Sequence, residues 1–215
     1  MSWGDSLMLE QTLFQESDGG SNPTSPLQFL KISYGEAYKL VSKFHYLGNK
    51  RFIGQYCFGI IDNYNIIGAI VYSPLSVPNS AQSAFGLPRG HYPDLLEMSR
   101  MVLQPNLNGK NVGSQLIAYS LRQLKKQKIR AVISYADSSR HIGTLYQACN
   151  FSYHGLSPQK NDFFFDDGTK LSRGKCKGEK GQWLPRSRKH RYLYIFDKDL
   201  KTIWPQEPYP KTPHE

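Results

Sequence analysis

The stretch DLLEMSRMVLQPNLNGKNVGSQLIAYSLRQLKKQKIRAVISYAD (residues 94–137) decides the fold of this protein. Its opening, DLLEMSRMVL (94–103), predicts a strand, and AVISYAD (131–137) predicts a second, short apolar strand. Between them, SQLIAYSLRQLKKQ (114–127) has apolar residues at helical spacing and lysines in its last turn. The first strand is expected to place four side chains on one face: Leu96, Met98, Arg100 and Val102.

The flanking segments extend this unit on both sides. Ser33 and Glu36 form a capping box at the start of a helix that ends before Gly48. Further along, the sequence predicts two strands joined by a turn (56–61 and 65–73), a loop (73–93), a short helix (142–150), a strand (151–155) and a closing strand (190–196). The predicted fold class is α/β (α+β), with a mixed central sheet flanked by helices and a basic insertion before the last strand.

Composition limits the class of protein. A chain of 215 residues, 39% of them hydrophobic, can bury one sizeable core. No run approaches the roughly 18 apolar residues of a membrane span, and the first residues lack the pattern of a secretory signal. The three cysteines, Cys57, Cys149 and Cys176, are far apart and suit a reducing compartment. We expect a cytoplasmic protein with an acidic disordered arm (1–26), one domain (27–200) and a C-terminal tail (201–215).

Charge is distributed unevenly along the chain. Residues 1–26 contain four acidic residues and no Lys or Arg, whereas residues 170–191 contain nine Lys and Arg and one acidic residue. A segment this basic either contacts a polyanion, releasing condensed counterions from phosphates, or is a solvated surface loop.

The turn NGKNVGS (108–114) lies between the first strand and its helix. A glycine-containing strand-to-helix turn directs several backbone N–H groups at one point, next to the positive end of the helix. The turn is therefore either an anion site for phosphate or pyrophosphate, or a tight turn without a ligand.

These segments resemble the GNAT acyltransferase superfamily. The turn is similar to its pattern R/Q-x-x-G-x-G/A, although Asn108 and Asn111 depart from it, and IGTLYQACNFSYHG (142–155) is similar to its last helix and strand. The resemblance implies acetyl-CoA or a related coenzyme A donor, and a role for Tyr146 in protonating the departing thiolate. It implies cofactor contacts from Val102, Asn108, Gly109, Lys110, Asn111, Val112, Gly113 and Ser114.

A narrower resemblance is to the Mom family of phage DNA-modification proteins. It rests on SKFHYLG (42–48), LEMSRMVL (96–103), ISYADSSRHIGTLYQACNF (133–151) and KHRYLYIF (189–196). The resemblance implies addition of a carbamoylmethyl-type group to the exocyclic amine of adenine in double-stranded DNA, which shields phage DNA from restriction. The location would then be the cytoplasm of a bacterial host. Iron is also implied, although no ligand spacing in the chain supports a dedicated site.

Five residues are candidates for catalysis. Arg100 either stabilises an anion or leaving group, or forms an ion pair with Glu97 or Asp137. Asp137 either accepts a proton from the amine or caps the following helix. Tyr146 either donates a proton or packs in the core. His45 and Tyr46 close the first helix near the active cleft that the resemblance implies, where a histidine is either a proton carrier or a packing residue.

The basic segment supplies the candidates for DNA contact. Lysines and arginines suit phosphates, and Trp183 suits stacking on a displaced base. The candidate residues are Lys175, Lys177, Trp183, Arg186, Arg188 and Lys189, with Arg89 and His91 expected on the opposite wall of the cleft. Two other functions remain open: coenzyme A-dependent N-acyl transfer to a protein or small amine, and non-catalytic DNA binding. The sequence leaves the donor, the metal and the oligomeric state undetermined.

Overall fold

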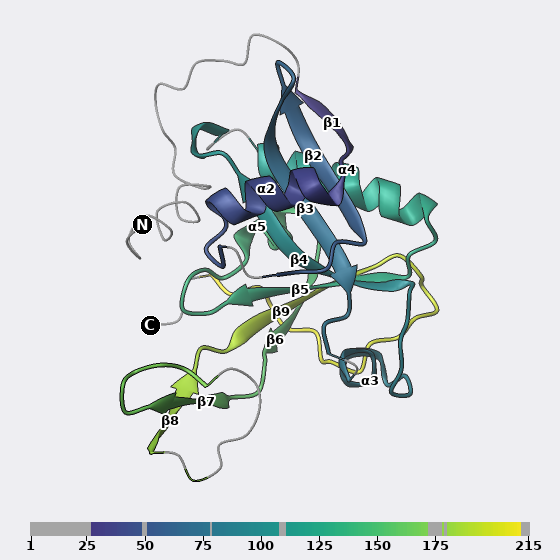
Figure 1. Ribbon diagram of the computed structural model, residues 1–215. Coiled ribbons are helices and arrows are strands. Elements are labelled where there is room, and N and C mark those ends of the chain that lie inside the picture. Colours follow the sequence, from purple (N-terminus) through teal and green to yellow (C-terminus); the bar gives the residue numbers. More distant parts are fainter. Residues whose placement is uncertain are drawn as a thin grey trace.

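The computed structural model describes residues 27–48, 51–77, 79–107, 111–171, 178 and 180–211. Its centre is a seven-stranded mixed sheet with helices on its faces, and a separate two-stranded ribbon lies beside it (Figure 1). The sheet contains β1 (Gln28–Lys31), β2 (Tyr56–Asp62), β3 (Asn65–Pro74), β4 (Leu95–Leu103), β5 (Ala131–Asp137), β9 (Lys189–Ile195) and β6 (Ser152–Leu156), in that spatial order. The predicted fold class is confirmed.

The first half of the sheet is an antiparallel meander from β1 to β4. Helix α2 (Tyr34–Phe44) packs on it and begins with the predicted capping box, in which Ser33 and Glu36 satisfy each other's backbone N–H groups. The helix buries Ala37, Leu40 and Val41 against the sheet. Its last residues therefore lie beside the middle of β4, which brings His45 and Tyr46 to the centre of the molecule.

Helix α4 (Val112–Lys126) connects β4 to β5, which pair in parallel. Its apolar stripe is buried as the spacing predicted and includes Leu116, Ile117, Leu121 and Leu124. The helix starts at Val112, two residues before the predicted start. Asn111 precedes it in the left-handed conformation, with a φ of 54°.

Strand β4 contains a bulge that the alternating pattern did not predict. Tyr72 pairs with Met98 and Val71 pairs with Arg100, so Ser99 is an extra residue on β4. The predicted common face of Leu96, Met98, Arg100 and Val102 is therefore wrong. Met98 faces the core under α4, whereas Val102 faces the core under α2 and Arg100 contacts Phe52 on that side. The bulge moves Arg100 to the opposite face from Met98.

The structure adds elements that the sequence reading missed. The predicted loop 73–93 contains helix α3 (Ser80–Phe85), and a 3-10 turn, η1 (Pro105–Leu107), follows β4. The expected basic insertion also differs: β7 (Lys160–Phe165) and β8 (Gly181–Arg186) form the separate ribbon, and Lys189 and Arg191 belong to β9. Short segments without a clear apolar stripe carry too little periodicity to be recognised.

The C-terminal segment packs against the domain. Trp204 is buried with α3, the backbone N–H of Glu207 donates to the Tyr153 carbonyl (2.9 Å), and the Tyr209 hydroxyl donates to the Phe151 carbonyl (2.8 Å). The segment expected as a tail from residue 201 thus covers part of the sheet. The expected arm, residues 1–26, lies outside the described residues.

Candidate active site

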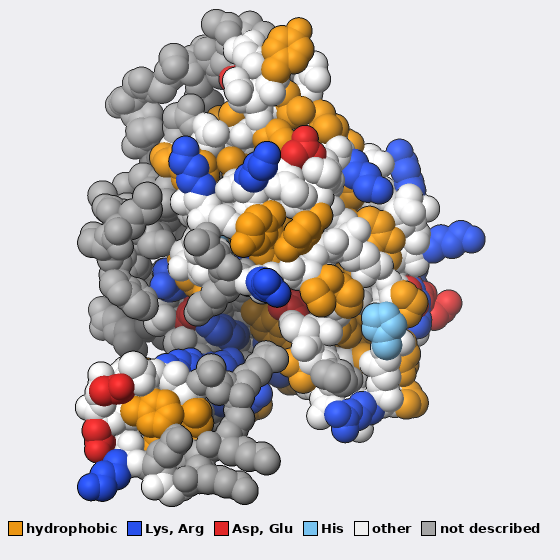
Figure 2. All heavy atoms as spheres, viewed as in Figure 1, with side chains coloured by type: hydrophobic (Ala, Val, Ile, Leu, Met, Phe, Trp, Pro, Cys, Tyr) orange, Lys and Arg blue, Asp and Glu red, His pale blue; other side chains and the backbone are white. Residues whose placement is uncertain are grey.

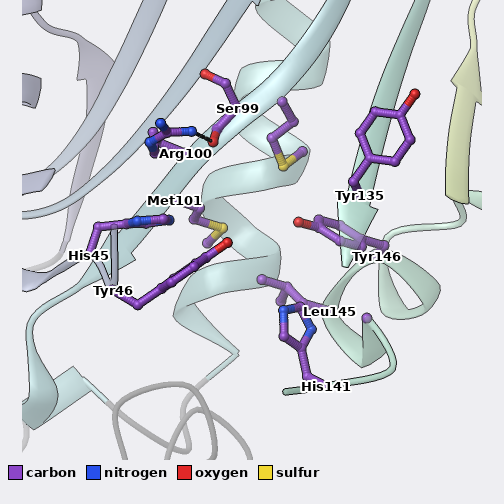
Figure 3. A pocket seen from close by; sticks show the side chains of 11 residues that line it. His45, Tyr46, Ser99, Arg100, Met101, Tyr135, His141, Leu145 and Tyr146 are labelled. Carbon is purple, nitrogen blue, oxygen red and sulfur yellow. Dashed lines mark hydrogen bonds between the residues drawn. The ribbon is translucent and has the colours of Figure 1, made fainter. Parts of the chain in front are cut away.

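A cavity lies where β4 and β5 separate. The two strands pair only from Leu95 and Ala131 to Met98 and Ser134; beyond that point β4 follows β3 and β5 follows β9. Helix α5 (Thr144–Ala148) covers the opening from one side, and the end of α2 covers it from the other (Figures 1 and 3). The cavity holds about 110 Å³ and is lined by His45, Tyr46, Met98, Ser99, Arg100, Met101, Tyr135, His141, Gly143, Leu145 and Tyr146.

Arg100 occupies one wall of this cavity without an acidic partner. Its Nη1 donates to the Ser99 carbonyl (2.6 Å), its guanidinium lies 5.4 Å from the Phe52 ring centre, and its Nε is buried without a hydrogen bond. In the described part of the chain, no carboxylate lies within ion-pair distance of it. Burial lowers its pKa, an effect that nearby Tyr46 and Glu97 oppose.

The ion pairs that the sequence left open for Arg100 do not form. The Glu97 carboxylate instead accepts from the Ser76 hydroxyl, and Asp137 pairs with Lys189. A half-buried cation with no acidic partner in the described part of the chain loses hydration without gaining a compensating charge, which is unfavourable to the folded state. Arg100 is therefore a site where an anionic ligand group would be stabilised.

The environment of His45 favours the neutral form of its ring. Burial, with contributions from Arg100 and Arg140, lowers its pKa to about 3. Its Nδ1 accepts from the Leu47 backbone N–H (3.2 Å), so the neutral ring carries its proton on Nε2. A group with these properties donates a hydrogen bond at neutral pH and does not act as a base.

The Tyr46 ring packs against the His45 ring and the Arg140 guanidinium. Its ring centre is 4.4 Å from that of His45, and the Arg140 guanidinium carbon lies 4.1 Å from it. Arg140 is a residue that the sequence reading missed, and one of its guanidinium nitrogens, Nη1, is buried without a hydrogen bond. It lies three residues after the end of β5, at the carboxyl edge of the sheet, where ligand-binding residues of α/β folds concentrate. That position, next to His141, was the feature of the sequence that could have identified Arg140 as a site residue.

Tyr146 faces Tyr46 across the cavity. The two side chains come from opposite walls, and their hydroxyls point toward the middle, whereas the Tyr135 hydroxyl points away from it (Figure 3). The Tyr146 ring is held by Phe151 and Tyr192, at centre distances of 5.6 and 5.2 Å. Methionines and Leu145 form the apolar surface between the polar groups.

Asp137 lies outside the cavity lining. Burial would raise its pKa, but hydrogen bonds from Lys189, Ser187 and Ser139 lower it to about 2. The Asp137–Lys189 ion pair joins the end of β5 to the start of β9. A carboxylate held in this way is a poor proton acceptor at neutral pH.

The first turn of α4 lies against the cavity floor. A Cβ atom added at Gly113 would come within 3.3 Å of both Leu145 and Met101, which line the cavity. The Asn111 side chain makes no capping hydrogen bond, and the Ser114 hydroxyl donates to the Asn111 carbonyl (2.8 Å). Among the described residues, the N-cap side chain therefore leaves the first-turn N–H groups without a capping hydrogen bond, an arrangement that suits an anion.

A second hollow follows the outer side of α4. It holds about 480 Å³, and its lining includes Ser114, Arg122, Lys125 and Cys149. The first turn of α4, the apolar residues of this hollow and its two cations would suit an extended phosphorylated thiol such as coenzyme A. Of the other residues expected at the cofactor, Val112 and Val102 are in the core, and Asn108, Gly109 and Lys110 lie outside the described residues.

The residues expected to contact DNA fall into separate regions. Trp183 and Arg186 lie on the ribbon, and Arg188 and Lys189 lie at its base. Arg89 and His91 are exposed on the loop before β4, at the end of the sheet opposite the ribbon, so they do not form the opposite wall of the cavity. Lys175 and Lys177 lie outside the described residues.

Among the described residues, no group of three or more His, Cys, Asp or Glu is arranged to hold a metal ion. No helix in the described ranges is long and apolar enough to cross a bilayer.

Solved structures share this fold at low sequence identity. A protein described as an acetyltransferase from Acinetobacter baylyi is 10% identical, covering 84% of this chain and 98% of its own, with a TM-score of 0.51. An N-acetyltransferase from Staphylococcus aureus is 12% identical (80% and 99% covered, TM-score 0.50). A ribosomal-protein alanine N-acetyltransferase from Escherichia coli is 10% identical (82% and 99% covered, TM-score 0.50).

The protein therefore has the acetyltransferase fold, with a cavity at the point where its two central parallel strands separate. No curated protein sequence matches the chain. Residues 26–211 match the Mom protein family, and the chain belongs to that family.

Proposed function

We propose that the protein transfers a carbon group from a small donor to the exocyclic amine of adenine in double-stranded DNA. The observation that carries this proposal is Arg100, a cation that has no acidic partner among the described residues and lies in a cavity that also contains two tyrosine hydroxyls. Membership of the Mom family supports DNA adenine as the acceptor. The carbamoylmethyl type of modification rests on the family resemblance alone.

The reaction requires a new bond between adenine N6 and the donor carbon. N6 loses one proton, which replaces the proton that the leaving group takes up, and the leaving group takes the electron pair of the bond that breaks. A coenzyme A thioester, if bound, would supply the activated carbon and a thiolate leaving group. In the proposed mechanism, the Arg100 guanidinium stabilises the negative charge that develops, and the Tyr146 hydroxyl donates a proton to the leaving group.

Other residues in the cavity position the reactants. His45 Nε2–H and the Tyr46 hydroxyl donate hydrogen bonds to the base or the transferred group, and Met98, Met101 and Leu145 exclude water around them. His45 is a poor base at neutral pH because its pKa is about 3, and His141 is the other histidine of the lining. Positioning of the reactants is expected to outweigh any single acid or base, since held geometry can lower the barrier by up to about 7–11 kcal/mol.

The test is the composition of DNA from a bacterial host that expresses the protein. Enzymatic digestion and mass spectrometry of the nucleosides should reveal an adenosine species of increased mass. The Arg100→Met variant should not produce it, whereas the matched Arg130→Met variant, altered at the opposite end of β4 and β5, should. Unmodified DNA from a host with folded protein would contradict the proposal. Binding of coenzyme A together with unmodified DNA would instead favour N-acyl transfer to a protein or small amine.

A further inference from the structure

The β7–β8 ribbon is separate from the seven-stranded sheet. It is inserted between β6 and β9, which are hydrogen-bonded neighbours in that sheet, so the chain leaves and re-enters at one place. Figure 1 shows it standing apart from the other layers. A two-stranded ribbon buries little surface and contributes little to the stability of a domain.

The base of the ribbon contacts the loop that leads to the cavity. The Ser138 backbone N–H donates to the Arg188 carbonyl (3.0 Å), and Lys189 pairs with Asp137. Arg188 also donates to the carbonyls of Ser157 and Leu156, which fixes both ends of the insertion. Because Arg140 and His141 follow Ser138 within three residues, the ribbon begins beside the mouth of the cavity.

One face of the ribbon carries an aromatic cluster that is open to solvent. Phe163 pairs directly with Trp183, at a ring distance of 5.4 Å, and Phe165 packs on Phe163 at 5.5 Å. Phe163 is buried beneath the cluster, but Trp183 remains 58% exposed. All six residues of β8 are exposed. An exposed tryptophan packed on a second aromatic ring offers a flat apolar surface to a partner, and tryptophan is enriched at such contacts.

The other face carries an unfavourable charge pair. Lys160 and Arg186 are directly opposite each other, and in the described part of the chain neither has a carboxylate within ion-pair distance. The nearest acidic residue on this face, Asp162, pairs with Lys170. Like charges in opposite positions destabilise a strand pair, and an anion bound between them removes that cost.

The space between ribbon and body is also basic. Figure 2 shows Lys and Arg side chains in the recess between the ribbon and the rest of the molecule, and an apolar patch on the ribbon itself. This arrangement combines cations for a phosphate backbone with an aromatic side chain for bases. A two-stranded ribbon has the width that the major groove of DNA admits.

We propose that the β7–β8 ribbon lies in a groove of the DNA duplex and that Trp183 occupies the space vacated when a base is extruded toward the cavity. Lys160 and Arg186 contact the phosphates. This inference rests on the proposed function in one respect only, namely that the substrate is double-stranded DNA. Extrusion of a base leaves a gap in the stack, and an aromatic side chain that fills it reduces the loss of stacking.

The test is binding of synthetic duplexes without any donor. The wild-type protein should bind a duplex with one abasic position more tightly than the intact duplex, since the gap is already present. Trp183→Ala should weaken binding of the abasic duplex about tenfold and remove the preference, and Trp183→Phe should restore part of it. Tyr64→Ala is the matched control, because Tyr64 is fully exposed on the distant β2–β3 turn.

Salt dependence tests the charge pair independently. The Lys160→Gln, Arg186→Gln double variant should reduce the slope of log Kd against log salt by about 2, as expected for two lost phosphate contacts. Ribbon variants that bind like the Tyr64→Ala control would overturn the inference, as would a single strand that binds as tightly as the duplex. DNA modification that persists in those variants would leave the proposed function intact. If the ribbon variants bind DNA more weakly but the wild-type protein produces no modified adenine, the ribbon inference would stand and the proposed function would fail.

Discussion

An arginine lies at each end of the β4–β5 pair, and the two differ in their ion pairing and in the direction of their pKa shift. At the closed end, Arg130 donates to Asp197 (2.8 Å) and lies 3.6 Å from Asp94, and its pKa is raised, chiefly by the hydrogen bond to Asp197. At the open end, Arg100 has no acidic partner among the described residues, and burial lowers its pKa. The first arginine is stabilised by the fold itself. The second is costly to the fold until an anion binds, which is typical of a functional site.

Exchanging each arginine for methionine gives the sharpest test of this comparison. Arg100→Met should reduce adenine modification at least about 100-fold, because it removes the cation that meets the developing charge. Its melting temperature should stay the same or rise, since an uncompensated charge is lost. Modification is measured by nucleoside mass spectrometry and stability by thermal unfolding.

Arg130→Met is the matched control and should have the reverse effect. Its ion pairs are partly exposed, so their loss should cost about 1 kcal/mol, or roughly 2–4 °C in melting temperature for a chain of this size. Modification per folded molecule should be retained. If Arg100→Met proved the more destabilising variant and remained active, the distinction between the two ends would be wrong.

Removing a tyrosine hydroxyl at the open end should reduce modification less than removing Arg100 does. Tyr146→Phe should lower the rate of modification about 10- to 100-fold with little change in KM for DNA, because only the proton donor is removed and the ring still packs on Phe151 and Tyr192. Tyr135→Phe serves as the control, since its hydroxyl points away from the cavity (Figure 3). Equal rate losses in both variants would contradict the assigned role.

The pH dependence of stability tests the open end without any measurement of activity. His45 has a pKa of about 3 in the folded protein and about 6.5 when unfolded, so the unfolded chain binds more protons between these values. The free energy of unfolding should therefore fall as the pH is lowered from about 6.5 toward 3, and His45→Gln should flatten this decline. Denaturant titrations at several pH values measure it, with His91→Gln on the exposed loop as the control. A decline unchanged by His45→Gln would show that the folded protein also protonates this residue.

Much of the fold was readable from local pattern. The capping box of Ser33 and Glu36 and the apolar stripe of α4 lie where periodicity placed them, because each depends on residues three or four positions apart. The β2–β3 hairpin was similarly marked by its turn residues. The family resemblance, in turn, selected four residues that the structure brings around one cavity: His45, Tyr46, Arg100 and Tyr146.

Other parts of the site could not be predicted in this way. The bulge at Ser99 is set by the partner strand, and alternation within β4 gives no sign of it. The role of Asp137 depended on Lys189, which is far away in sequence and joins it across β5 and β9. Arg140 was overlooked because its contact with Tyr46 links two loops that no local pattern connects.

The sequence by itself determined the class of fold, the central strand–helix–strand unit and the presence of a basic segment, because each is encoded in residues close together along the chain. Only the tertiary structure decided that Arg100 has no acidic partner among the residues described, that His45 is neutral, and that the basic segment includes a strand of a ribbon beginning beside the cavity. These are properties of burial and of distant neighbours. Their energies depend on which charges and dipoles surround a group in space, and that arrangement exists only after the chain has folded.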